Sequence, residues 1–178
     1  MLAYFLIFSA AVLRVIPHPA NFAAIAATGL FAGVYLNKKQ AILLPIAGMM
    51  LSDIFIGFDS WQSRLVVYGS LALAGLIGMW VKNHKNIFSV AGGSLLGSAL
   101  FYLLTNLVWL YPATMYPHTA AGQLLSYANA LPFFRNTLLG DLVYTAIFFG
   151  VYEAVLYFQK TYDDNQGPSS DPVLAGKN

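Results

Sequence analysis

The chain has 178 residues, of which 58% are hydrophobic and only 9% carry a charge. A soluble domain has roughly 25% charged residues, so this chain has too few to cover a surface that faces water. It has no cysteine, which excludes disulfides and thiolate metal sites, and its net charge of +2 gives no basic surface for nucleic acid. We therefore expect an integral membrane protein that contacts membrane lipid and binds no nucleic acid.

Long apolar segments, separated by small groups of charged residues, follow one another along the chain. Such segments predict membrane-spanning helices of about 17–25 residues, and they lack the alternating pattern of a membrane β-barrel. We expect spans at residues 2–16, 21–36, 41–57, 64–81, 87–110 and 137–158. The fold class is thus an all-α membrane protein with six transmembrane helices, in which residues 1–160 form one domain.

The basic residues of the connecting segments predict the orientation of the chain. One side of the membrane receives Lys38, Lys39, Lys82, Lys85 and Lys160, and the other receives Arg14, Arg64 and Arg135. Since lysine and arginine are enriched in cytoplasmic loops, the side with five basic residues is expected in the cytoplasm. Both termini are then cytoplasmic, and the polar tail at residues 161–178 is predicted to be disordered.

Polar side chains concentrate in the outer half of the predicted bundle. Asp53 and Asp141 each lie about one helical turn inside an outer helix end, at a depth similar to that of Arg14. Ionisable groups within a membrane usually face the bundle interior or a hydrated cavity. We expect a ligand-binding cavity open to the outside, and a layer of salt bridges between helices is the alternative. The candidate ligand-binding residues are Arg14, His18, Asn21, Asp53, Asn106, Trp109, Arg135, Asn136 and Asp141.

Small residues recur at four-residue spacing in several predicted spans. They include Gly29 and Gly33 in the second span, Ser70, Ala74 and Gly78 in the fourth, and Ser94 and Ser98 in the fifth. Small side chains at this spacing let helix backbones approach closely. We expect packing within the chain, and docking of a partner helix is the alternative.

The sequence contains no phosphate-binding loop, no nucleophile elbow and no metalloprotease motif. His18, His118 and Asp53 could share a metal ion, but they lack the spacing of metal ligands. Asp53 and Asp141 could relay protons, but no third acid continues a path across the membrane. We therefore predict that the chain is not an enzyme and uses no cofactor and no metal.

Four stretches together resemble an uncharacterised bacterial family of small integral membrane proteins. They are RVIPHPANF at residues 14–22, LSD at 51–53, TNLVW at 105–109 and PFFRNTLLGD at 132–141. The resemblance covers roughly residues 10–155 and implies a bacterial cytoplasmic (inner) membrane location without implying an activity. Ala20 stands where the family pattern often has a second proline.

The predicted architecture is also similar to that of the substrate-binding S components of energy-coupling-factor vitamin transporters. This resemblance is one of topology, and it implies binding of a small-molecule ligand near the outer face. It also implies a transmembrane coupling subunit and ATPases as partners, although Ala3, Ala10 and Ala11 do not form the usual docking pattern of the first helix. A structural or accessory subunit of a larger membrane assembly is the alternative function.

Overall fold

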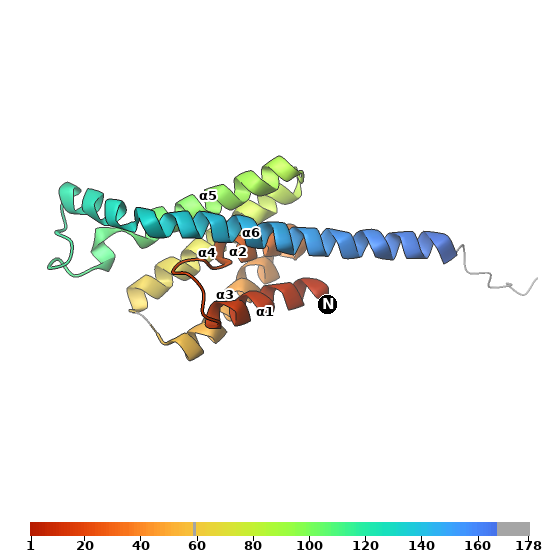
Figure 1. The fold of residues 1–178 in the computed structure, drawn as a ribbon, viewed down its shortest axis with the longest axis horizontal. Helices are drawn as coiled ribbons and strands as arrows, with labels where there is room; N and C mark the ends of the chain where they lie inside the picture. The colour runs from red at the N-terminus through yellow and green to blue at the C-terminus, as the bar shows by residue number, and fades with distance from the viewer. Residues whose placement is uncertain (59, 167–178) are drawn as a thin grey trace, which may run out of the picture.

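The computed structural model describes residues 1–58 and 60–166, and in this part of the chain helices are joined by short connections without strands (Figure 1). Its helices are α1 (Leu2–Val15), α2 (Ile25–Tyr35), α3 (Lys38–Ile56), α4 (Trp61–Lys82), α5 (Ile87–Thr105) and α6 (Ala120–Gln166), and a short 3-10 turn, η1, covers Val108–Leu110. The prediction of an all-α fold with six helices is confirmed.

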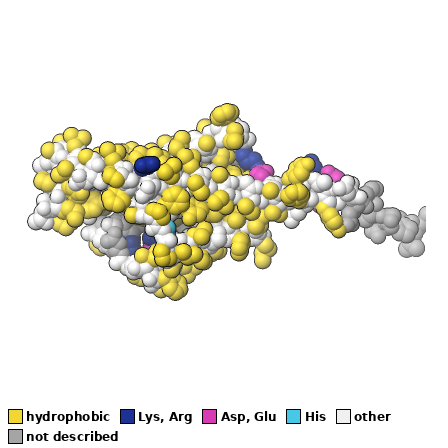
Figure 2. Space-filling model, viewed as in Figure 1, with side chains coloured by type: hydrophobic (Ala, Val, Ile, Leu, Met, Phe, Trp, Pro, Cys, Tyr) yellow, Lys and Arg dark blue, Asp and Glu magenta, His cyan; other side chains and the backbone are white. Residues whose placement is uncertain are grey.

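Among the described residues, four helices, α3 to α6, are long and apolar enough to cross a membrane. The other two are shorter, and α2 has only 11 residues. At a rise of ~1.5 Å per residue, α2 is about 16 Å long, roughly half of a ~30 Å hydrocarbon core. Figure 2 shows that hydrophobic side chains dominate the face of the bundle in view, as expected for a surface that contacts lipid.

The turns that connect α2 to α3 and α4 to α5 lie at the same end of the bundle. Tyr35 and Lys85, which flank these turns, both contact the carboxylate of Glu153 on α6. We call this the lysine end, after Lys38, Lys39, Lys82 and Lys85, and we call the opposite end the cavity end. The N-terminus and the C-terminal part of α6 also lie on the side of the lysine end (Figure 1).

Polar side chains mark where three of the helices begin. Asn37 accepts a hydrogen bond from the Gln40 amide at the start of α3, and Ser60 accepts one from the Ser63 amide at the start of α4. Asn86 forms a capping box with Ser89 at the start of α5. Asparagine and serine satisfy the free amides of a first helical turn, so these residues fix the helix boundaries.

Helix α2 lies at the centre of the bundle, and each residue from Ala26 to Val34 is buried. It packs closely against α4 because both helices present glycine at the crossing. A Cβ atom on Gly33 would lie 2.2 Å from the Gly75 carbonyl oxygen, and one on Gly78 would lie 2.3 Å from the Leu30 carbonyl oxygen. The expectation that these small residues serve packing within the chain is confirmed.

Several predicted boundaries are wrong. The fifth span was expected to reach residue 110, but α5 ends at Thr105 and residues 106 and 107 are not helical. The second span was expected from residue 21, but α2 begins at Ile25 and residues 21–24 are not helical. Residues 111–136, which connect the predicted fifth span to the sixth, were expected to form a loop before the sixth span begins at residue 137, but α6 begins at Ala120. The polar residues and Pro132 of this segment indicated a loop, although its alanine and leucine residues favour helix.

Helix α6 has 47 residues, and its C-terminal part extends beyond the other helices (Figure 1). It remains helical to Gln166, six residues into the segment that was expected to be a disordered tail from residue 161. The remainder of that predicted tail, residues 167–178, lies outside the described residues.

Candidate functional site

A cavity of about 500 Å³ lies at the cavity end, between α4, α5 and α6. Its walls combine aromatic rings with amides and hydroxyls. The aromatic residues are Phe101, Tyr102, Tyr111, Tyr116, Phe133 and Phe134. The amides are Asn21, Asn106 and Asn129, and the hydroxyls include Ser63, Thr105, Ser126 and Thr137. Within residues 1–58 and 60–166, the side chains that line this cavity carry no formal charge.

Hydrogen bonds join the two helices that form most of the cavity wall. The backbone carbonyl of Asn106, at the end of α5, accepts from Gln123 Nε2 and from Ser126 Oγ, each at 2.9 Å. The Tyr102 hydroxyl donates to the Tyr127 carbonyl oxygen at 2.7 Å, and the Tyr102 ring stacks on Phe134 with centroids 4.3 Å apart. The aromatic part of the cavity is therefore held in place before any ligand binds.

The segment between α1 and α2 brings Asn21 to the cavity. Asn21 has a φ of 60°, a left-handed conformation that asparagine tolerates better than most residues. The segment is held against α6, because the Asn136 amide donates to the Ala20 carbonyl oxygen at 2.9 Å. The Asn21 side chain forms no hydrogen bond within the described part of the chain, so its amide is available to a ligand.

Arg14 and Asp53 form an ion pair away from this cavity. Arg14 also donates to Ser52 Oγ at 2.6 Å, and the Tyr68 hydroxyl donates to Asp53 Oδ2 at 2.7 Å. These contacts connect α1, α3 and α4, and a void of only about 30 Å³ lies beside Arg14. Arg14 and Asp53 therefore form a salt bridge between helices, which was the alternative to a ligand-binding cavity.

Asp141 is fully buried and caps the N-terminus of α2 from the neighbouring helix α6. Its Oδ1 accepts from the Ala27 amide at 3.0 Å, and its Oδ2 accepts from Ser98 Oγ at 2.7 Å. The carboxylate thus satisfies a first-turn amide and lies at the positive end of the α2 dipole. A buried helix start without such a partner would be costly, which explains an acid at this depth.

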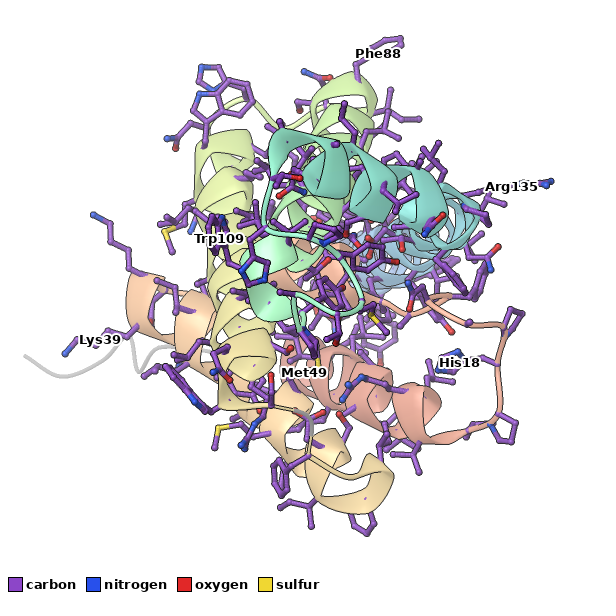
Figure 3. All side chains as sticks on the ribbon, turned by 90° about the vertical axis from the view of Figure 1, so that its left-hand side faces the viewer. His18, Lys39, Met49, Phe88, Trp109 and Arg135 are labelled. Carbon is purple, nitrogen blue, oxygen red and sulfur yellow. The ribbon has the colours of Figure 1, made fainter. Side chains whose placement is uncertain are left out.

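The other candidate residues are dispersed over the cavity end. The His18 ring nitrogens lie near the backbone oxygens of Pro19 and Arg14. Trp109 is 69% exposed and packs on His118, and Arg135 is exposed and points away from the bundle (Figure 3). The expectation that the charged residues converge in one chamber is therefore wrong: two of them pair together, Asp141 caps a helix and Arg135 faces outward.

Of the nine candidate residues, Asn21 and Asn106 line the cavity. Sequence reasoning missed the aromatic wall. Tyr102 follows Ser94 and Ser98 at four-residue spacing and shares their face of α5, so this spacing could have predicted Tyr102 as a candidate site residue. Phe133 and Phe134 lie in the segment that was expected to be a loop, where no helical face could be assigned to them.

A family model described as "Family of unknown function (DUF6580)" matches residues 1–166 of the chain. The chain belongs to the DUF6580 family. This agrees with the resemblance to an uncharacterised family, and membership in DUF6580 brings no activity with it. No curated protein and no solved structure matches the chain significantly.

Proposed function

We propose that this DUF6580 protein binds a small solute reversibly in the cavity between α4, α5 and α6. The observation that carries the proposal is the lining of that cavity, in which six aromatic side chains surround a few amides and hydroxyls. Ligand sites typically have volumes of about 300–1,000 Å³ and mostly apolar walls with a small number of placed polar groups. The volume of about 500 Å³ lies within that range.

The lining favours an uncharged solute that carries a ring. A charged solute would lose its hydration and find no opposite charge on the described lining residues, which is unfavourable. A planar ring could stack on the aromatic wall, and the free amide of Asn21 can both donate and accept a hydrogen bond.

We further propose that the lysine end faces the cytoplasm of a bacterial cell and that the cavity opens outward. The four lysines at one end support this orientation through the positive-inside rule. In this arrangement the protein resembles an S component: it captures a solute outside, while a transmembrane coupling subunit and ATPases supply the energy for uptake. The chain itself performs no covalent chemistry.

Thermal unfolding of the purified protein with a panel of small solutes tests the proposal. An uncharged ring-bearing solute should raise the melting temperature. Asn21→Gly, which keeps the left-handed backbone accessible, and Phe134→Ala should weaken binding by about tenfold, the effect of one lost hydrogen bond or ring contact. Arg135→Ala, the neighbouring residue that points outward, is the control and should bind normally. Binding by none of the solutes, or equal weakening by Arg135→Ala, would contradict solute binding at this site.

An accessory role in a larger membrane assembly is the second candidate, and the C-terminal part of α6 favours it. Tyr157, Phe158 and Tyr162 are each more than 60% exposed on the segment that extends past the bundle. Purification from native membranes should then recover a stoichiometric partner that is lost when Phe158 is replaced by serine. Recovery of the chain alone would argue against this role.

A further inference from the structure

A second cavity, of about 530 Å³, forms a groove between α5 and α6 in the half of the bundle near the lysine end. Its walls are apolar and include Val90 and Ala91 from α5 and Leu142, Ala146 and Phe149 from α6. The solute cavity described above lies at the opposite end, so this groove is a separate feature, and its function does not depend on solute binding.

Small side chains create the groove. Ala91 of α5 and Ala146 and Gly150 of α6 line it, and a Cβ atom on Gly150 would meet no atom within 4 Å. From Leu142 to Glu153 the groove extends about 16 Å along α6, at ~1.5 Å per residue, which is close to half of a ~30 Å hydrocarbon core. The length of the groove along α6 therefore matches the thickness of the hydrocarbon layer of one leaflet.

The end of the groove at the lysine end is polar and carries one charge of each sign. Lys85 Nζ lies 2.5 Å from Glu153 Oε1 and 5.2 Å from the ring centroid of Tyr35. The Tyr35 hydroxyl donates to the same Glu153 oxygen. Lys85 and Glu153 are both partly exposed, with side-chain exposures of 41% and 46%. They can thus reach a headgroup at the membrane surface while remaining paired.

We propose that this groove binds a phospholipid with a primary-amine zwitterionic headgroup, of the phosphatidylethanolamine class. One acyl chain lies between α5 and α6, the phosphate contacts Lys85, and the ammonium donates to Glu153. An anionic headgroup would satisfy Lys85 but leave Glu153 facing negative charge. A choline headgroup has no N–H group with which to donate a hydrogen bond.

Photo-crosslinking of the wild-type protein tests the site directly. The protein is reconstituted in vesicles of equal parts phosphatidylethanolamine, phosphatidylglycerol and phosphatidylcholine, with one lipid at a time carrying a photoreactive acyl chain. Labelling by phosphatidylethanolamine should concentrate on residues 87–91 and 142–150, and it should exceed labelling by the other lipids by about tenfold, the effect of one charge-assisted hydrogen bond. Equal labelling by the three lipids, or labels spread evenly over all helices, would overturn the proposal.

Substitutions then separate the groove from the general lipid surface. Gly150→Leu fills the groove and should remove the concentrated label. Gly92→Leu is the matched control, because a Cβ atom there also meets nothing within 4 Å but Gly92 does not line the groove. Glu153→Gln should abolish the preference for the amine headgroup, because it removes the carboxylate that accepts from the ammonium, whereas Lys85→Gln should weaken labelling by all three lipids. Unchanged labelling in Gly150→Leu, or a co-purified protein instead of lipid on this face, would contradict lipid binding.

Discussion

Asp141 stabilises the start of the short helix α2 from a neighbouring helix. Its carboxylate, contributed by α6, is the hydrogen-bond partner of the Ala27 amide in the first turn of α2 and of the Ser98 hydroxyl on α5. Asp141→Ala would leave the Ala27 amide buried without this partner, at a cost of roughly 1–3 kcal/mol, whereas the Ser98 hydroxyl could still donate to the Ser94 carbonyl oxygen at 3.1 Å. We therefore expect Asp141→Ala to lower the free energy of unfolding by about 1–3 kcal/mol, and Asp141→Asn to lower it less, since its amide oxygen still accepts one bond. Chemical denaturation in detergent micelles measures this, and a variant as stable as the wild type would contradict the capping role.

The Arg14–Asp53 ion pair allows a second prediction at the same scale. Removing one partner of a fully buried pair costs about 3–5 kcal/mol, but Arg14 is 25% exposed, so water compensates part of the loss. We expect Arg14→Met and Asp53→Leu each to destabilise the protein by about 1–3 kcal/mol, and the double variant to be more stable than the sum of both predicts. A double-mutant cycle of unfolding free energies measures the coupling. Strictly additive effects would show that the pair does not stabilise the bundle.

At the scale of the elements, the close crossing of α2 and α4 depends on glycine. Gly33→Ala places a methyl group against the Gly75 carbonyl, and overpacking of this kind costs about 1–3 kcal/mol. Gly69→Ala is the control on α4, because a Cβ atom there meets nothing within 4 Å. We expect Gly33→Ala to lower the melting temperature and Gly69→Ala to leave it unchanged or raise it, since alanine favours helix over glycine. Equal effects in the two variants would contradict the close approach.

The helices themselves were largely predictable from the sequence, but their boundaries at the cavity end were not. Hydropathy detects segments that are apolar over a full span, and α3, α4 and α5 meet that condition. Helix α2 is shorter because residues 21–24 are not helical: Asn21 has a left-handed φ of 60°. The apolar residues that follow it, Phe22 to Ala24, cannot be distinguished from helix by hydropathy. Asp141 was expected about one turn inside a helix end, but α6 begins well before it, at Ala120. Its partner is a backbone amide on another helix, and such a contact leaves no pattern in the sequence.

For the molecule as a whole, the absence of cysteine makes the topology directly measurable. Lys39→Cys at the lysine end and Thr119→Cys at the cavity end introduce single exposed thiols. With the lysine end in the cytoplasm, a membrane-impermeant maleimide should label Thr119→Cys in intact cells and label Lys39→Cys only after the membrane is opened. The opposite pattern would place the cavity on the cytoplasmic side and remove the argument for uptake from outside.

The central claim is that a solute occupies the cavity between α4, α5 and α6, and its most direct test uses two alanines of α6. Ala130 lines the cavity, whereas Ala128 is exposed and does not. In single-cysteine variants at these positions, a small hydrophilic thiol reagent should modify both. A solute that raises the melting temperature should slow modification of Ala130→Cys by about tenfold and leave Ala128→Cys unchanged. An unreactive Ala130→Cys, or equal protection at both positions, would contradict the account.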